Sequence, residues 1–118
     1  MMAETTQLEL VTPARVMVSK AAEMVVVPGS EGLFGVLPRH SALLASLQRG
    51  VVEVYESGNV IDRFMIDGGL ADVTPEGVTI LAERAVDLSA TTSQELKERA
   101  ANASDSEANF LNDAIEAL

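Results

Sequence analysis

Residues 51–66 read VVEVYESGNVIDRFMI, two runs rich in β-branched and aromatic residues around the triplet Ser57-Gly58-Asn59. Such residues favour strands, and a short connection containing glycine is typical of a β-hairpin. The stretch therefore predicts an antiparallel hairpin with a three-residue loop. It also indicates that the chain around it is built mainly from strands.

Further short strands are expected on both sides of this hairpin. The runs at 7–10, 16–18, 24–27, 70–73 and 78–82 are apolar or alternating, and turn residues such as Pro28-Gly29 and Pro75-Glu76-Gly77 separate them. Strands that recur roughly every eight to twelve residues are typical of a β-sandwich or barrel. Residues 41–47, SALLASL, remain open between a helical turn and an irregular apolar segment.

The C-terminal part has a helical pattern instead. The stretches Thr92-Ser-Gln-Glu95 and Ser104-Asp-Ser-Glu107 are capping boxes, and each precedes a run without Gly or Pro. Spacing at i, i+3, i+4 and i+7 gives the second run one apolar stripe, made of Leu111, Ala114, Ile115 and Leu118. We therefore expect an α+β fold: a β domain over residues 1–86 and an antiparallel two-helix hairpin over 87–118.

Composition excludes several classes of function. Eighteen acidic against eight basic residues give a net charge of −10, which disfavours binding to nucleic acid or anionic lipid. The chain has no cysteine, so disulfides and thiolate chemistry are excluded. No apolar run of about eighteen residues could cross a bilayer, and the first residues lack the pattern of a signal peptide. These features predict a cytosolic protein.

The sequence has no arrangement typical of a catalytic or phosphate-binding site. His40 is the single histidine, its neighbours provide no metal ligand, and no G-x-S-x-G motif is present. We interpret His40 as partly buried or as part of an interface. Gly29, Gly32 and Gly35 are not a P-loop, because acidic Glu31 lies among them and no lysine follows.

Three aspartates are candidates for a pair of neighbouring carboxylates, as acid–base catalysis would need. Asp62, Asp67 and Asp72 are five residues apart, which does not place two of them side by side on a strand. We expect them to be exposed and solvated, with Asp67-Gly68-Gly69 forming a tight turn. No catalytic residue, metal site or cofactor is therefore predicted.

The segment between Pro28 and Pro38 is the unusual one. Leu33 and Phe34 are large apolar residues in a loop punctuated by glycines. They either fold back into the core or form an exposed apolar tip, next to Glu31, that a partner protein covers. The residues alone leave both interpretations open.

Longer stretches resemble a known family. Residues 27–44 read VPGSEGLFGVLPRHSALL, and 47–54, 64–73 and 78–85 agree with the same family in order and spacing. The chain resembles, over residues 7–88, the epsilon subunit of the F-type proton-translocating ATP synthase, whose mitochondrial counterpart is called delta. The absence of a transit peptide points to the bacterial form. The resemblance implies a ten-stranded β-sandwich followed by a two-helix hairpin.

The resemblance also implies a role and partners. It implies a non-catalytic subunit of the rotating central stalk, peripheral to the cytoplasmic face of the bacterial inner membrane. This subunit binds the gamma subunit and the c-subunit ring, and couples proton translocation to ATP synthesis or hydrolysis in the alpha/beta hexamer, which it contacts indirectly. The family's ring-facing lobe matches Ser30, Glu31, Gly32, Leu33 and Phe34, and its gamma-facing surface matches His40, Ser41 and Leu43.

The hairpin departs from the family pattern. In many members a long, basic second helix extends and inhibits the hexamer, whereas residues 100–118 contain four acids and no base. The second helix, 105–118, would reach only about 20 Å. We therefore expect weak or absent inhibition. An alternative is a nucleotide-sensing switch, because some relatives bind ATP through an Ile/Leu-Asp-x-x-Arg-Ala motif. Here 95–100 read ELKERA, and Arg99 is the one candidate nucleotide contact.

Overall fold

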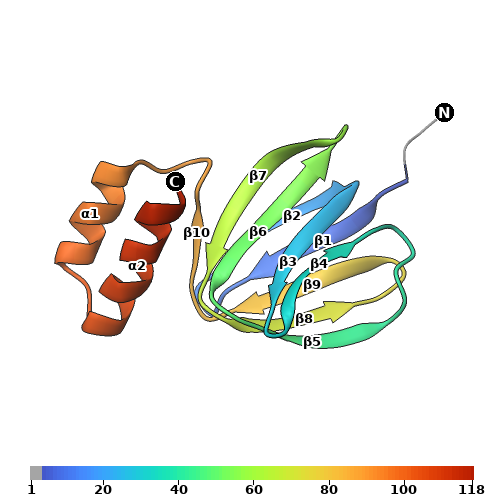
Figure 1. Cartoon of the computed structure of the whole chain (residues 1–118), viewed down its shortest axis with the longest axis horizontal. Coiled ribbons are helices and arrows are strands. Elements are labelled where there is room, and N and C mark those ends of the chain that lie inside the picture. Colours follow the sequence, from blue (N-terminus) through green and yellow to red (C-terminus); the bar gives the residue numbers. More distant parts are fainter. Residues whose placement is uncertain (1–3) are drawn as a thin grey trace.

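The computed structural model describes residues 4–118, which form ten strands followed by two helices. The strands are β1 (Thr6–Val11), β2 (Val16–Ala22), β3 (Met24–Gly29), β4 (Gly32–Val36), β5 (Leu43–Leu47), β6 (Gly50–Glu56), β7 (Asn59–Ile66), β8 (Gly69–Val73), β9 (Gly77–Ala82) and β10 (Ala85–Asp87). The helices are α1 (Ser93–Ala101) and α2 (Asp105–Ala117). The strands build a sandwich, and the helices lie side by side at one end of it (Figure 1). The predicted α+β fold is confirmed.

The sheet runs in the order β10-β7-β6-β3-β5-β8-β9-β1-β2, with β4 paired to β3. Its two halves join where β3 meets β5 through a single pairing, Gly29 with Leu47. Most pairs are antiparallel, and β1 with β9 is parallel. Alternation along β1 directs Leu8 and Leu10 inward and Gln7 and Glu9 outward, as a half-buried strand requires. Valine and isoleucine from both halves fill the space between them.

Three local predictions need correction. Glu56 pairs with Asn59, so the loop of the 51–66 hairpin is Ser57-Gly58 alone, with φ of 53° and 77°. Positive φ at both loop residues suits the right-handed twist of the flanking strands better than a three-residue loop would. Residues 43–47 form β5, neither helix nor irregular. The residues did not predict β4, which contains Gly32 and Gly35, or β10, which has only three residues.

Both helices begin where the capping boxes predict. The Thr92 side chain accepts a hydrogen bond from the Glu95 amide at 3.2 Å, and Ser104 accepts one from the Glu107 amide at 3.3 Å. These bonds satisfy amides that the first turn of a helix leaves without partners. The apolar stripe is shifted from the prediction, because Phe110 is buried whereas Leu118 is 44% exposed.

A second, smaller core holds the helices to the sandwich. Leu96, Phe110, Leu111 and Ala114 pack together with Met65, Val86 and Leu88, a cluster distinct from the core between the sheet halves. Figure 1 shows α2 lying between α1 and β10. The hairpin therefore contacts the sandwich mainly through α2.

Asp67 is not the exposed, solvated carboxylate that the sequence suggested. Its side chain is only 15% exposed, and its two oxygens accept hydrogen bonds from Arg49 Nε and Arg84 Nη1, each at 2.9 Å. Asp62 is also paired, with Lys20 at 2.8 Å, whereas Asp72 is exposed as expected. Burial opposes ionisation of Asp67, but the hydrogen bonds and charges of the two arginines outweigh it, so the pKa of Asp67 is lowered.

This lowered pKa predicts how stability depends on pH. The ion pairs of Asp67 contribute fully above its unfolded-state pKa of about 3.9, and are lost as pH falls through the lower folded-state pKa. Asp67→Asn should therefore lower the free energy of unfolding by about 1–3 kcal/mol at pH 7. This difference from the unmodified chain should become smaller below pH ~4. Urea unfolding at a series of pH values measures it. A difference that stays constant down to pH ~2 contradicts the assignment.

Candidate protein-interaction surface

The segment that carried the unusual apolar residues is a β-hairpin, not a loop. Gly29 of β3 pairs with Gly32 of β4, so only Ser30 and Glu31 form the turn. Gly32 has a φ of +132°, which favours glycine. The Ser30 amide donates to the Ser46 carbonyl at 2.9 Å, and Gln48 Nε2 donates to the Gly29 carbonyl at 2.9 Å. The turn thus projects from a base that the next strand holds in place.

The two bulky residues of this hairpin have different environments. Leu33 is 71% exposed, whereas Phe34 is half-buried and packs against the sandwich core. Successive side chains of a strand point to opposite faces, which separates the pair. Each interpretation left open by the sequence is therefore correct for one residue. Leu33 is therefore the more exposed residue of the pair, and the assignment of Phe34 to a ring-facing surface stays a prediction.

A groove of about 350 Å³ lies between this turn and β5. It is lined by residues 29–32, Phe34 and residues 43–46. The structure therefore brings Ser30, Glu31, Gly32 and Phe34 together with Leu43, which the sequence analysis had placed in a different surface. Sequence reasoning missed Leu44, which lines the groove and is 66% exposed. The apolar run 41–47 was noticed, but its strand register was needed to place Leu44 outside.

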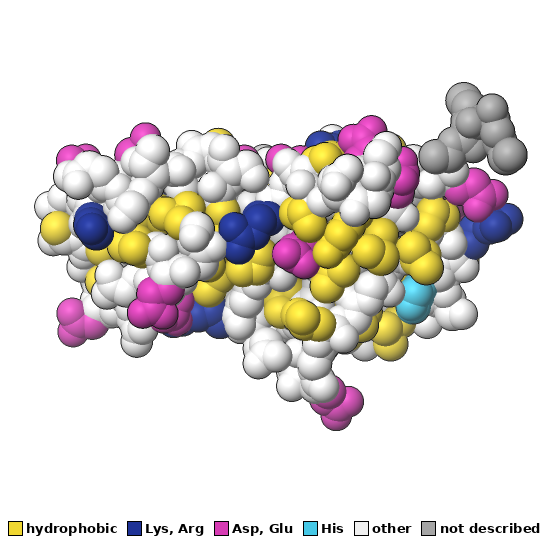
Figure 2. Space-filling view, turned by 45° about the horizontal axis from the view of Figure 1, so that its top comes forward, with side chains coloured by type: hydrophobic (Ala, Val, Ile, Leu, Met, Phe, Trp, Pro, Cys, Tyr) yellow, Lys and Arg dark blue, Asp and Glu magenta, His cyan; other side chains and the backbone are white. Residues whose placement is uncertain are grey.

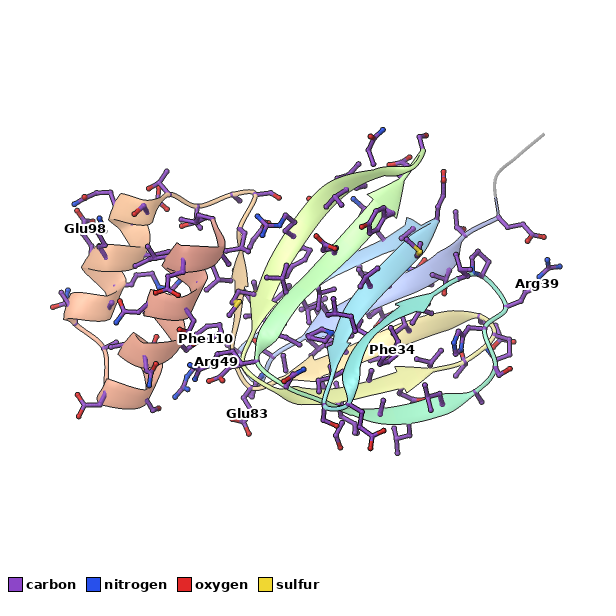
Figure 3. The ribbon with its side chains drawn as sticks, in the orientation of Figure 1. Phe34, Arg39, Arg49, Glu83, Glu98 and Phe110 are labelled. Carbon is purple, nitrogen blue, oxygen red and sulfur yellow. The ribbon has the colours of Figure 1, made fainter. Side chains whose placement is uncertain are left out.

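His40 and Ser41 lie in the connection from β4 to β5, away from the turn at Ser30. The His40 amide donates to the Leu37 carbonyl at 3.2 Å, and His40 Nδ1 donates to the Ser41 carbonyl at 2.7 Å. The Arg39 amide donates to the Pro75 carbonyl at 3.1 Å, which fastens the connection to the β8–β9 turn. His40 is half-buried and Ser41 is exposed. Figure 3 shows Arg39 at the end of the sandwich farthest from the helices.

Exposed apolar side chains gather in this part of the chain. Of the nine large hydrophobic residues exposed among residues 4–118, four lie between positions 33 and 44: Leu33, Leu37, Leu43 and Leu44. Figure 2 shows hydrophobic side chains concentrated over the sandwich, with the histidine at their edge. Exposed apolar side chains that gather in this way are typical of interaction surfaces.

Within the described residues there is neither a cluster of metal-ligating side chains nor a membrane-spanning helix. Across residues 4–118, no three His, Asp or Glu side chains come close enough to hold a metal ion. Neither helix in that range has the length and apolar character needed to cross a bilayer.

Arg99, the candidate nucleotide contact, faces carboxylates. Its guanidinium lies 3.9 Å from Glu107, and the adjacent groove of about 550 Å³ is also lined by Glu95 and Glu98. Figure 3 shows Glu98 on the outer helix, away from the sandwich. Three carboxylates around one guanidinium repel a polyphosphate. The geometry disfavours ATP at this position.

Two solved structures with a similar fold are chains of mitochondrial ATP synthases. A chain in the cryo-EM structure of the Euglena gracilis mitochondrial ATP synthase (OSCP/F1/c-ring) superposes with a TM-score of 0.67 at 24% identity, covering 95% of this chain and 76% of that one. A chain of the Tetrahymena thermophila mitochondrial ATP synthase central stalk and c-ring gives 0.60 at 17% identity, covering 76% and 72%. At these identities the likeness establishes the fold alone.

Sequence comparisons are more specific. The family model described as "ATP synthase, Delta/Epsilon chain, beta-sandwich domain" matches residues 5–88. The ATP synthase epsilon chain of Rhodospirillum rubrum is 44% identical over 104 residues, covering 88% of this chain and 78% of the relative. That of Hyphomonas neptunium is 47% identical over 95 residues (80% and 70%), and that of Mesorhizobium japonicum 40% over 114 residues (91% and 84%). The chain belongs to the ATP synthase delta/epsilon family.

Proposed function

We propose that this chain is the epsilon subunit of the central stalk of a bacterial F-type ATP synthase and carries no catalysis of its own. It binds the gamma subunit and the c ring, and through them couples proton translocation to ATP synthesis or hydrolysis in the alpha/beta hexamer. The observation that carries the proposal is a set of exposed leucines, Leu33 on the anchored β3–β4 hairpin and Leu43 and Leu44 on β5. Through the complex, the chain is held at the cytoplasmic face of the inner membrane.

The β3–β4 turn is assigned to the c ring. Leu33 projects from β4 with 71% of its surface exposed, and Glu31 lies at the tip of the turn beside it. An apolar side chain next to a carboxylate suits a polar loop with a basic residue on the ring. Hydrogen bonds from Ser30 and Gln48 to neighbouring backbone fix the turn at its base. A stiff base transmits torque because little of the applied force is lost in bending.

The connection between β4 and β5 is assigned to gamma. His40 and Ser41 lie there, and the Arg39 amide ties the connection to the β8–β9 turn. Leu43 begins β5 and lines the groove beside Ser30 and Glu31, so it lies between the two assigned surfaces. β4 therefore separates a ring contact at one end from a gamma contact at the other. A subunit that binds the c ring near one end of a strand and gamma near the other end can join these two parts of a rotor.

The hairpin is assigned little inhibitory role. α2 has 13 residues, and its acids Asp105, Glu107, Asp113 and Glu116 are not balanced by any base within it. Such a helix repels an acidic surface on a catalytic subunit. Nucleotide sensing through Arg99 remains the alternative, but Glu95, Glu98 and Glu107 beside it argue against that role.

Replacing Leu33 with serine tests the ring contact. Burying a leucine side chain contributes about 1.5–3 kcal/mol, so Leu33→Ser should weaken attachment to the c ring about tenfold or more. Phe34 is left unchanged because its loss would disturb the core. The measurement is retention of the tagged subunit on detergent-solubilised c ring with gamma, together with proton-driven ATP synthesis in membrane vesicles.

Leu118→Ser is the matched control, since Leu118 is also an exposed leucine, at 44%, but lies at the end of the hairpin. It should leave attachment and synthesis unchanged. If Leu33→Ser binds the ring and supports synthesis as well as the control does, the proposed ring contact is wrong.

A further inference from the structure

The outer face of the sandwich at β3 and β6 carries apolar side chains around one carboxylate. Met24 pairs with Tyr55, and Val26 pairs with Glu53, across the two strands. Their neighbours along each strand are valines that point into the core and are fully buried, so these four side chains lie on the outside, where they are half-buried. We call Met24, Val26, Glu53 and Tyr55 the β3–β6 face.

Further groups extend this face on both sides. Val60 of β7 pairs with the tyrosine of the face, and Val60 and Ile61 are 38% and 37% exposed. On the other side Gly35 of β4 pairs with Val26, and the Met24 sulfur lies 3.5 Å from the position that a Cβ at Gly35 would take. Methionine is a flexible side chain that adapts to a partner. Figure 2 shows an acidic group among hydrophobic side chains over the sandwich.

Glu53 has no cationic partner within residues 4–118. Its carboxylate accepts a hydrogen bond from the Tyr55 hydroxyl at 3.4 Å, and no lysine, arginine or histidine of those residues forms an ion pair with it. Arg63 lies opposite on β7, but its Nη2 donates to the Ala117 carbonyl at 2.7 Å. A half-buried carboxylate bordered by apolar side chains is incompletely solvated, so a cation supplied by another molecule would stabilise it.

A helix covers the neighbouring part of the same sheet face. Met65 on β7 and Val86 on β10 belong to the second core, to which α2 contributes Phe110, and Val51 of β6 packs against that core. Along β6 the cover therefore ends between Val51 and Glu53. A sheet face is normally buried against helices or another sheet, and within residues 4–118 the β3–β6 face has neither. A further helix suits this position.

Charge determines which kind of helix fits. The chain has a net charge of −10, and α2 has four acids and no base, of which Asp113 is already bonded to Arg49 at 2.7 Å. A second copy of the chain would bring another Glu53 and the same net charge, so self-association through this face is disfavoured. Nucleic acid and anionic lipid are repelled for the same reason. A basic helix is attracted both by Glu53 and by the field of the whole chain.

We propose that the β3–β6 face docks a basic amphipathic helix of another protein. The apolar stripe of this helix covers Met24, Val26 and Tyr55, and a lysine or arginine at the edge of the stripe pairs with Glu53. The ring and gamma contacts assigned above use the β3–β4 turn and the β4–β5 connection. Docking at the β3–β6 face is therefore an additional contact, and it does not depend on either assignment.

A synthetic peptide tests the chemistry of this face. The probe is a helix-forming peptide of about 18 residues with leucines on one side and lysines on the other, and its counterpart has glutamate in place of each lysine. Added to the isotope-labelled full chain, the lysine peptide should shift amide resonances of β3, β6 and the start of β7, whereas the glutamate peptide should shift none. Shifts confined to other elements, or equal shifts with both peptides, overturn the proposal. This mapping needs no variant of the chain.

Glu53→Gln separates the ion pair from the effect of net charge. It should weaken binding of the lysine peptide about five- to tenfold, because the amide keeps the size of the side chain but cannot pair with a cation. Glu9→Gln is the matched control: Glu9 is an exposed carboxylate on β1, and its loss changes the net charge by the same amount. Fluorescence anisotropy of the labelled peptide measures both Kd values. Equal weakening in the two variants means that the attraction is unspecific, and it overturns the proposal.

Two further measurements identify the occupant. If amides of β3 and β6 shift when the chain alone is concentrated, a second copy occupies the face. If purified gamma competes with the lysine peptide, the face is part of the gamma contact. Either result overturns the proposal, whereas unchanged affinity for the peptide in the presence of bound gamma supports it.

Discussion

Gly69→Ala is expected to remove about 4 kcal/mol or more of the unfolding free energy, a large part of the stability of a domain this size. Gly69 has a φ of +134°, which non-glycine residues rarely adopt. A Cβ at this position would overlap the Leu81 carbonyl oxygen and lie 3.0 Å from the Ala82 Cα. Gly69 pairs with Ala82 in the β8–β9 ladder, so neither strand can move away without breaking that pairing.

Gly32→Ala separates the steric part of this effect from backbone strain. Gly32 has nearly the same φ, +132°, but no atom lies within 4 Å of the Cβ that would be added. Gly32→Ala should therefore lower the free energy of unfolding only by the strain of an unfavourable backbone conformation, about 1–3 kcal/mol. Urea unfolding of the two isolated variants measures both. If Gly69→Ala loses no more stability than Gly32→Ala, close packing against β9 is not what requires glycine at position 69.

Gly69 also illustrates the limit of reading a turn from sequence. The triplet Asp67-Gly68-Gly69 predicts a tight turn, and Gly68 and Gly69 do adopt positive φ. The triplet does not reveal that β9 lies against Gly69, because β9 begins several residues later and its register depends on the whole sheet. Local backbone preference is readable from a few residues, whereas close approach of two strands is a property of the fold.

The ion pairs of Asp67 were not predicted for the same reason: they depend on residues far away in the sequence. Its partners Arg49 and Arg84 are 18 and 17 residues away, and Arg49 is 64 residues from Asp113. No periodicity connects positions so distant, so a solvated carboxylate was the natural expectation. By contrast, Thr92 and Ser104 cap helices through amides three residues away, and both were predicted correctly. These two caps were predictable because each side chain and the amide it accepts from lie within one helical turn.

In the candidate interaction surface, too, some features could be predicted from local sequence and others depend on the fold. Glycines and the apolar pair marked residues 30–34 as unusual, and the structure places four of them around one groove. Alternation predicts that Leu33 and Phe34 face opposite sides, but only the pairing of β4 with β3 determines which one is exposed. Leu44 was missed because residues 41–47 carry no clear period. The surface was therefore locatable from sequence, but its exposed members were not.

Phe110→Ala is expected to unfold the hairpin while leaving the sandwich folded. Phe110 is 1% exposed within the second core, and truncating a buried phenylalanine costs about 3–5 kcal/mol. Helices of 9 and 13 residues have little stability alone, so losing their central anchor should melt both. Hydrogen exchange should show fast-exchanging amides throughout α1 and α2, with protection retained in the strands.

Phe64→Ala is the matched comparison, because the same substitution then falls in the core between the sheet halves, at a site 2% exposed. It should lower protection in the strands and the helices together, since the hairpin has no docking surface once β7 unfolds.

The pair of variants also tests the expected division between domains at residues 86 and 87, which passes through β10. Val86 belongs to the second core together with Phe110, yet all three residues of β10 pair with β7. If Phe110→Ala exposes β10 amides along with the helices, this strand unfolds with the hairpin and the division lies before Ala85. If β10 stays protected, β-pairing rather than side-chain packing decides where one unit ends. Loss of protection in every strand would mean that the two cores unfold as one, and the hairpin would not be a separate unit.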